Sequence, residues 1–219
     1  LCLIKDFLAA ARNNNHGNLQ GGGTAMDIAV DISGTVIETE RLMLRAWRES
    51  DLDDFYEYAS VEGVGEMAGW KHHECIEETR LILHAFIAEK SVFAIVHKQD
   101  NKAIGSLGLH TSWVNDDERY AHLKAKEIGF VLSKAYWGQG LMPEAVRAVI
   151  RFCFERLELD AVTVAHFSGN NQSKRVIEKC GFTFVKHGEY RSKRLNQTFA
   201  DLKYILSRDA YVSATFRKN

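Results

Sequence analysis

The stretch from Lys126 to Phe154, KEIGFVLSKAYWGQGLMPEAVRAVIRFCF, decides the fold. It begins with a short apolar run in which large side chains alternate with smaller ones, which predicts a strand. Two glycines, Gly138 and Gly140, follow the strand and precede a segment with helically spaced apolar residues. Pro143 and Glu144 fit the first turn of that helix, where proline loses no hydrogen bond and a carboxylate is favoured. The stretch therefore predicts a strand, a glycine turn and a helix.

This arrangement is typical of an anion-binding site. The first N–H groups of a helix have no partner inside the helix, so they point outward at its N-terminus. Glycine lets such a backbone approach a phosphate, because no Cβ stands in the way. The alternative is a plain structural turn. A P-loop is excluded because no Lys-Ser or Lys-Thr pair follows the glycines, and a dinucleotide fingerprint is excluded because the third glycine is missing.

The composition limits the classes of partner. The chain has 219 residues and is 46% hydrophobic, which suffices for a core without disulfides. A net charge of −1 gives no overall attraction to nucleic acid or to an anionic membrane, so neither is expected as a partner. Four cysteines without C-x-x-C spacing favour a reduced, cytoplasmic setting. No metal is expected, because the adjacent His72 and His73, predicted to lie on a helix, lack ligand spacing.

The chain divides into three regions. Residues 1–34 read as a leader or linker, native or derived from cloning, because they contain runs of asparagine and glycine. Residues 35–207 carry strand and helix patterns in the order β-α-α-β-β-β-α-β-α-β-β, which predicts an α/β (α+β) domain built on one mixed sheet. Residues 208–219 read as a C-terminal tail. The first strand is expected at Val36–Trp47, and the last two at Phe182–Val185 and Phe199–Leu206. The helix predicted over residues 74–90 offers the core Ile76, Leu81, Leu83, Ala85 and Phe86.

Three motifs follow one another along the chain. They are the E-I-G-F-x-L strand with its Y-W-G-x-G turn and E-A pair, the turn Asn170-Asn171-Gln172-Ser173, and the segment Glu178-Lys179-Cys180-Gly181-Phe182. In order and separation they resemble the GNAT superfamily of N-acetyltransferases, and most closely the ribosomal-protein N-terminal acetyltransferases of the RimJ/RimL type. The segment Thr39-Glu40-Arg41-Leu42, with Leu44 and Arg45, also resembles the first strand of this branch. The resemblance covers about Val36 to Leu206.

The resemblance implies a GNAT fold: a single mixed, mostly antiparallel sheet of about seven strands, splayed in the middle, with about four helices. It also implies acetyl-CoA as the acetyl donor. The amides of the splayed strand would bond the pantetheine arm as an added strand would, and the glycine turn would offer N–H groups to the pyrophosphate. The residues expected to bind acetyl-CoA are Phe130, Val131, Leu132, Trp137, Gly138, Gln139, Gly140, Leu141, Met142, Asn170 and Ser173.

Two positions depart from the general superfamily pattern Q/R-x-x-G-x-G/A. Trp137 stands at the Gln/Arg position, and Met142 stands at the final Gly/Ala position. Both departures change a side chain, so the backbone cradle for the pyrophosphate remains available.

Acetyl transfer from a thioester to an amine needs a neutral amine, a polarised carbonyl and a proton for the leaving thiolate. Glu127 is the first candidate for the base, because relatives often place a glutamate there and partial burial would raise its pKa. The alternative is a surface carboxylate, and Glu189 is the second candidate. Ser173 is expected to hold the CoA sulfur, unless it is only a hydroxyl at a helix start. Asn170 is expected to bind the cofactor, to cap the helix, or to do both.

The acceptor amine is not specified by the sequence. A peptide or protein N-terminus is the first expectation, by resemblance alone, and a polyamine, amino acid or antibiotic amine is the alternative. A non-catalytic acyl-CoA sensor is the rival from another class. The acidic residues 116–118 would attract a cationic amine unless they are simply solvated. A homodimer remains open, with the last strand and the tail available to a second subunit.

Overall fold

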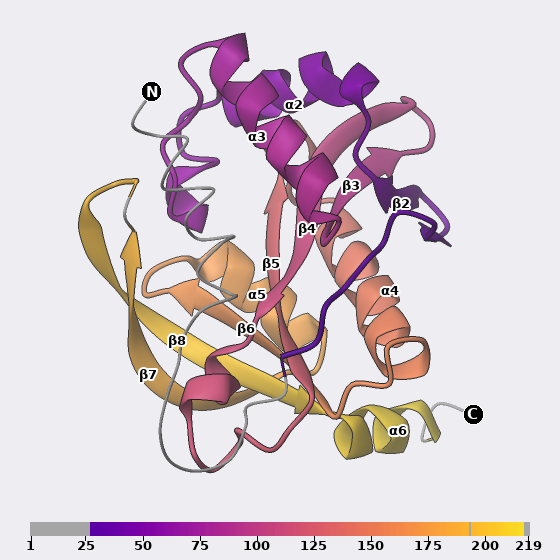
Figure 1. The fold of residues 1–219 in the computed structure, drawn as a ribbon, viewed down its shortest axis with the longest axis vertical. Coiled ribbons are helices and arrows are strands. Elements are labelled where there is room, and N and C mark those ends of the chain that lie inside the picture. Colours follow the sequence, from indigo (N-terminus) through magenta and orange to yellow (C-terminus); the bar gives the residue numbers. More distant parts are fainter. Residues whose placement is uncertain (1–26, 193, 217–219) are drawn as a thin grey trace.

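The computed structural model describes residues 27–192 and 194–216, which form one eight-stranded sheet with helices on both faces (Figure 1). The strands are β1 (Val36–Glu38), β2 (Leu42–Ala46), β3 (Val92–His97), β4 (Lys102–Thr111), β5 (Ala125–Leu132), β6 (Ala161–Phe167), β7 (Thr183–Ser192) and β8 (Gln197–Ser207). The helices are α2 (Leu52–Ala59), α3 (Ile76–Glu89), α4 (Leu141–Glu155), α5 (Asn171–Lys179) and α6 (Arg208–Phe216). The spatial order is β1-β2-β3-β4-β5-β6-β8-β7, and all neighbouring pairs are antiparallel except β5 and β6. The predicted mixed, mostly antiparallel sheet is confirmed.

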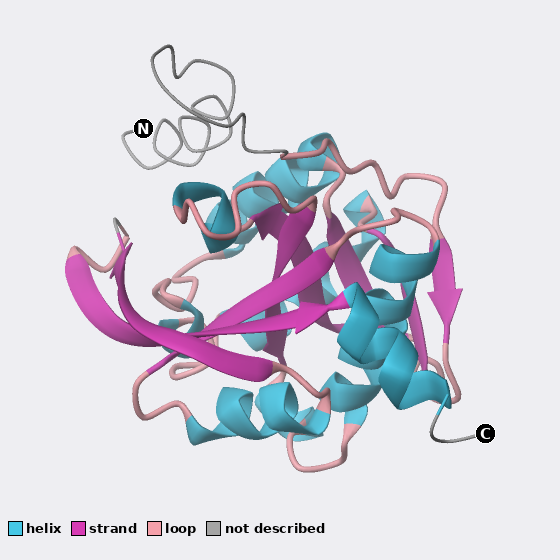
Figure 2. Cartoon of the chain, turned by 90° about the horizontal axis from the view of Figure 1, so that it is seen from below, coloured by secondary structure: helices cyan, strands magenta, loops and turns pink. Residues whose placement is uncertain are grey.

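Two apolar layers enclose the sheet, with helices above and below the strands in Figure 2. Strand β3 contributes to both layers, because its side chains point alternately to the two faces of the sheet. Phe93 joins the layer that contains α4 and α5, whereas Ala94 joins the layer that contains α2 and α3. The sheet is therefore buried on both sides at its centre. None of the helices in the described part of the chain is long and apolar enough to cross a membrane.

The central strands β5 and β6 separate. Within the described residues, their parallel pairing joins only Ala125, Lys126 and Glu127 of β5 to β6. Strand β5 continues to Leu132 and remains paired with β4 on its other side, with Leu132 opposite Gly105. The sheet is thus split from Ile128 onward, as predicted for a sheet splayed in the middle.

The number and length of the elements differ from the prediction at both ends of the domain. The first predicted strand is two strands, because the Thr39 hydroxyl accepts from Leu42 N–H (2.9 Å) and closes a turn between them. Strand β7 extends to Ser192, since it pairs with β8 along most of its length. Residues 208–216 of the predicted tail form α6, on which Tyr211 stacks against Phe154 (4.8 Å between ring centroids). The described residues therefore contain eight strands and five helices, against about seven and about four predicted.

The segment around α3 corrects two predictions. His72 and His73 precede the helix and do not lie on it, because His73 is buried and its Nδ1 contacts the Thr79 hydroxyl (2.8 Å). The buried face of α3 is formed by Thr79, Ile82 and Leu83, whereas Leu81 is 46% exposed. Leu83 is fully buried as predicted and Phe86 packs against the same apolar layer, so the prediction is wrong at Leu81.

Most of the predicted leader, residues 1–26, lies outside the described residues. Residues 27–34 lie against the domain, and Ile32 is fully buried. The Ile32 N–H donates to the Lys90 carbonyl (2.9 Å), and Lys126 Nζ donates to Asp27 Oδ1 (2.6 Å). The packed domain therefore begins no later than Asp27.

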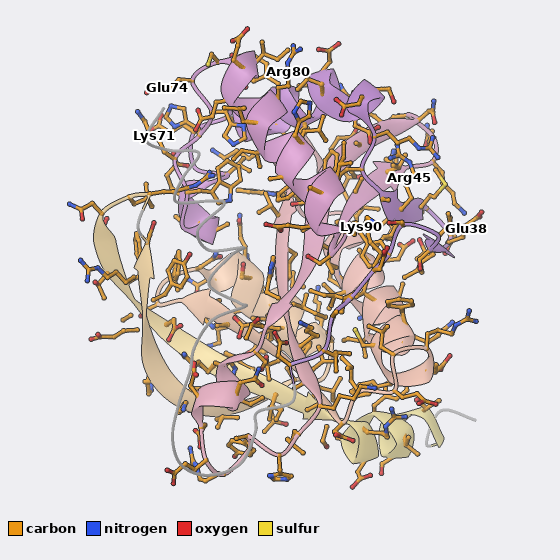
Figure 3. The ribbon with its side chains drawn as sticks, in the orientation of Figure 1. Glu38, Arg45, Lys71, Glu74, Arg80 and Lys90 are labelled. Carbon is orange, nitrogen blue, oxygen red and sulfur yellow. The ribbon has the colours of Figure 1, made fainter. Side chains whose placement is uncertain are left out.

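A buried ion pair joins β2 to the start of α2, at the position where Arg45 is labelled in Figure 3. The Arg45 guanidinium binds both oxygens of Asp51 (2.7 and 2.8 Å), and both residues are buried. We predict that Asp51→Ala lowers the free energy of unfolding by about 3–5 kcal/mol, because it leaves a buried guanidinium without its partner. Urea denaturation measures this loss, and the exposed Asp53→Ala serves as the control. An Asp51→Ala loss below about 1 kcal/mol would show that the pair behaves as a surface pair.

Candidate active site

A cavity of about 440 Å³ opens where β5 leaves β6. It lies between the end of β5, the N-terminal ends of α4 and α5, and the turn that contains Met67 and Ala68. The predicted residues that line it are Phe130, Val131, Leu132, Trp137, Gly138, Gly140, Leu141, Met142, Asn170 and Ser173. Gln139 is the one predicted binding residue that does not line the cavity. Two stretches that are distant in the sequence, residues 130–142 and 170–173, thus meet at one site.

The backbone of β5 directs hydrogen-bonding groups into the split. Ser133 N–H donates to the Ile104 carbonyl on β4 (2.8 Å), and alternate residues of a strand point their peptide groups to opposite sides. Phe130 and Leu132 therefore turn theirs towards β6, beyond the last registered pair of the two strands. The Trp137 indole N–H donates to the Leu132 carbonyl (2.8 Å) and so closes the outer end of the split. The N–H groups of Phe130 and Leu132 and the Phe130 carbonyl face the position that an added strand would occupy.

The glycine turn brings the N-terminus of α4 to the same cavity. Gly138 and Gly140 both have left-handed φ angles, 78° and 77°, which L side chains rarely adopt. Gly140 is the N-cap of α4, and Glu144 lies in the first turn, as predicted. The N–H groups of Leu141 and Met142 have no acceptor within the helix because they belong to its first turn. Together with the turn they form a site suited to a phosphate.

Asn170 caps α5, one of the two roles that the sequence left open, and also contacts the turn around Met67. Its Oδ1 accepts from Ser173 N–H (3.0 Å), so it caps α5, and its Nδ2 donates to the Met67 carbonyl (3.3 Å). The side chain is buried and also lines the cavity. Asn170 therefore ties the turn around Met67 to the start of α5 and fixes one wall of the cavity.

Glu127 lies at the vertex of the split, where β5 and β6 are last paired. Burial raises its pKa to about 7, against a smaller lowering by the Trp113 N–H, which lies 3.4 Å from Oε2. Lys203 lowers this pKa further and Asp201 raises it, so the two β8 residues share the surroundings of Glu127. Glu127 is three residues from the cavity-lining Phe130, which is roughly 10 Å along a strand. A carboxylate of this pKa is suited to accept a proton near neutral pH.

Glu189, the second candidate base, is exposed on β7. It stands opposite Ala200, one position away from the pair formed by Gly188 and Asp201. Since successive side chains of a strand alternate between faces, Glu189 lies on the face opposite Asp201 and Glu127. The structure therefore brings Glu127, and not Glu189, to the split.

Comparison with known proteins agrees with this geometry. Residues 41–183, more than half of the chain, match the family model described as an acetyltransferase (GNAT) domain. The chain belongs to the GNAT acetyltransferase family.

Individual GNAT relatives are distant. YoaA of Bacillus subtilis, an uncharacterised N-acetyltransferase, is 26% identical over 152 residues, which are 67% of this chain and 82% of YoaA. A GNAT-family acetyltransferase from Bacillus anthracis superposes with a TM-score of 0.69 at 21% identity, over 80% of this chain and 99% of the other. The ribosomal-protein-S5-alanine acetyltransferase of Vibrio fischeri gives a TM-score of 0.62 at 20% identity, over 80% and 97%. The structural likenesses establish the fold, and the family establishes an acetyltransferase that uses acetyl-CoA.

Several residues of this GNAT site were missed in the sequence. Met67 and Ala68 are not among the predicted site residues, and they reach the cavity through contacts that sequence patterns do not encode. Arg175 and Lys179 also line the cavity, and they lie one helical turn apart on the same face of α5. Asp201 is buried on the face of Glu127, and its Oδ1 lacks a hydrogen-bond partner within the described residues.

The acidic loop at residues 116–118 contains less free charge than its sequence indicates. Asp117 is held by Arg119 Nη2 (2.8 Å) and Lys186 Nζ (2.6 Å), and these contacts lower its pKa far below the ordinary value. The attraction of a cationic acceptor would then depend on Asp116 and Glu118, which are exposed.

We predict that the ionisation of Glu127 controls the pH dependence of turnover in this GNAT enzyme. Because its pKa is raised to about 7, the basic form is lost as the pH falls through about 7. The ratio of wild-type to Glu127→Gln kcat/KM should therefore rise by about tenfold between pH 6 and 8 and then level off. Taking the ratio removes the titration of the acceptor amine, which both proteins share. A ratio independent of pH would contradict the assignment.

We predict that Gly138→Ala weakens CoA binding, whereas Gly181→Ala does not. Both glycines have left-handed φ angles and open space where a Cβ would stand, so each substitution strains the backbone by roughly 1–2 kcal/mol. Only Gly138 lines the cavity. Thermal unfolding measures the shared strain, and calorimetry with CoA measures affinity. An equal loss of affinity in both variants would show that the effect is general destabilisation.

Proposed function

We propose that this enzyme transfers the acetyl group of acetyl-CoA to a primary amine by direct attack of the amine on the thioester. The observation that carries the proposal is the split between β5 and β6, which joins a phosphate-type helix terminus at one end to a carboxylate of raised pKa at the other. The pantetheine arm is a chain of amides that matches the peptide groups of Phe130 and Leu132 as a strand would. The pyrophosphate then fits the N–H groups of the turn and of α4.

The proposed chemistry uses few groups of the chain. The amine nitrogen forms a bond to the carbonyl carbon while the carbon–sulfur bond breaks, and the electron pair leaves on sulfur. N–H groups of β5 stabilise the negative charge that develops on the carbonyl oxygen. Glu127 accepts the proton of the amine through a water molecule, since its side chain lies beyond the inner end of the cavity. Ser173, which lines the cavity at the start of α5, donates a hydrogen bond to the leaving sulfur.

We infer that the acceptor is the N-terminus of a peptide or protein. Support comes from the resemblance to the RimJ/RimL branch and from the structural neighbour from Vibrio fischeri, a ribosomal-protein-S5-alanine acetyltransferase. The RimJ/RimL assignment is itself part of this proposal, because the identities of 26% or less establish only the wider family. A small-molecule amine is the competing acceptor.

The test incubates the protein with acetyl-CoA and a matched panel of acceptors and follows the release of free thiol. The panel contains peptides with N-terminal alanine or serine, the same peptides with a blocked N-terminus, polyamines, free amino acids and aminoglycosides. We expect turnover with the free peptides and none with the blocked ones. Glu127→Gln and Ser173→Ala should each lower kcat/KM with the best acceptor by at least about tenfold, whereas Glu189→Gln should not.

Each contrary result has its own meaning. Turnover confined to small amines would refute the peptide acceptor and leave the acetyltransferase intact. Binding of acetyl-CoA without turnover across the panel would favour a non-catalytic sensor. Unchanged kcat/KM in both Glu127→Gln and Ser173→Ala would contradict the assigned residues.

A further inference from the structure

The turn between β1 and β2 lies against the N-terminus of α4, although the two are about a hundred residues apart in sequence. The carboxylate of Glu144, in the first turn of α4, accepts hydrogen bonds from Thr39 and Arg41 of the β1–β2 turn. The contacts to its Oε1 come from Thr39 Oγ1 (2.6 Å) and Arg41 N–H (2.9 Å), and those to its Oε2 come from Arg41 Nε (2.8 Å) and Nη2 (2.6 Å). Each carboxylate oxygen therefore has two donors from one turn.

This contact is a fixed ion pair. Burial by itself would raise the pKa of Glu144, but the hydrogen bonds from Thr39 and Arg41 outweigh it and hold the pKa below its ordinary value. The carboxylate is therefore ionised at neutral pH, and it balances the charge of Arg41. Because the pair carries no net charge, we expect Arg41 to influence a nearby phosphate mainly by orienting the backbone of the glycine turn, and less by direct charge attraction.

The Arg41 guanidinium also binds the glycine turn itself. Its Nη1 donates to the carbonyl of Gln139 (2.9 Å), and its Nη2 is the atom nearest to where a Cβ of Gly140 would stand (3.7 Å). A trans peptide is planar, so the Gln139 carbonyl and the Gly140 N–H point in opposite directions. With the carbonyl held by Arg41, the Gly140 N–H points away from Arg41, and Gly140 lines the cavity.

The sequence of the turn explains why such a restraint is needed. Gln139 is flanked by Gly138 and Gly140, which populate left- and right-handed conformations with similar ease. A rotation of the peptide between Gln139 and Gly140 would turn a carbonyl, and with it a negative dipole, towards the phosphates. Holding one orientation before the ligand arrives removes that ordering cost from binding.

We propose that Arg41 is a positioning residue of the pyrophosphate site, which orients the Gly140 N–H towards the ligand while Glu144 holds the guanidinium. The proposal rests on acetyl-CoA being the donor, as in the proposed function. It also explains why Gln139 is the one residue of the turn that does not line the cavity: its carbonyl faces Arg41, and its side-chain Nε2 donates to the Ala135 carbonyl (3.2 Å).

The test compares CoA with acetyl-pantetheine, which lacks the pyrophosphate and the adenosine 3′-phosphate attached to it. Arg41 contacts the glycine turn proposed for the pyrophosphate, so a positioning role should affect CoA alone. We expect Arg41→Gln to weaken CoA binding by about tenfold or more in calorimetry and to leave acetyl-pantetheine binding unchanged. In turnover with a fixed amine, KM for acetyl-CoA should rise while kcat at saturation stays within about twofold. Arg41→Lys should behave like Arg41→Gln, because lysine keeps the charge but lacks the planar fork that binds Glu144 and Gln139 together.

Lys98→Gln is the matched control. Lys98 Nζ contacts the same turn through Glu38 (2.9 Å), which is labelled in Figure 3, and through the Thr39 carbonyl (2.7 Å). This substitution removes one positive charge from the turn, as Arg41→Gln does, without touching the glycine turn. We expect its affinity for CoA to equal that of the wild type.

The outcomes separate the proposal from its premise. If the wild-type protein binds no CoA, the proposed function fails. If it binds CoA and both Arg41 variants bind equally well, the positioning role is refuted. Full affinity in Arg41→Lys alone would show that only charge matters, and an equal loss for CoA and acetyl-pantetheine would show that Arg41 acts on the general packing. Either result overturns the proposal.

Discussion

The structure depends on one limit to hydrogen bonding: β5 is paired with β6 for three residues and then continues without it. Peptide groups that are removed from water need partners, so a strand that leaves its neighbour inside a protein exposes groups that a ligand can satisfy. Contacts with β4 and with Trp137 hold β5 in this position. Strand β4 holds the other edge of β5, and the Trp137 indole takes the Leu132 carbonyl at the outer end.

The wall opposite β5 is fixed by contacts between distant segments. The turn around Met67 is bound to α5, because Asn170 Nδ2 donates to the Met67 carbonyl. The same turn is bound to the β7–β8 hairpin, because the buried Ser192 hydroxyl donates to the Gly69 carbonyl (2.6 Å). Arg41 and Glu144 fix the glycine turn from the side opposite the cavity. A site built from backbone groups needs such restraints, since the backbone itself supplies the recognition.

The sequence predicted what is local and periodic. The strand before Ser133, the two glycines and the acidic first turn of α4 could be predicted because each reflects spacing or a backbone requirement within a few residues. The split itself followed from the family resemblance. The contact of Arg41 with Glu144, the role of Met67 and the burial of Asp201 could not be predicted, because they depend on how separate segments pack. The β1–β2 break and the length of β7 were missed for a related reason: a side-chain hydrogen bond and a pairing partner decided them, and intrinsic propensity did not.

The central claim is that the free edge of β5 receives an extended ligand. Amide hydrogen exchange of the full chain, measured with and without saturating CoA, tests it most directly. The account predicts that the amides of Phe130, Leu132 and residues 138–142 become strongly protected when CoA binds, whereas β3 amides change little. CoA binding that leaves the Phe130 and Leu132 amides unprotected would contradict the claim.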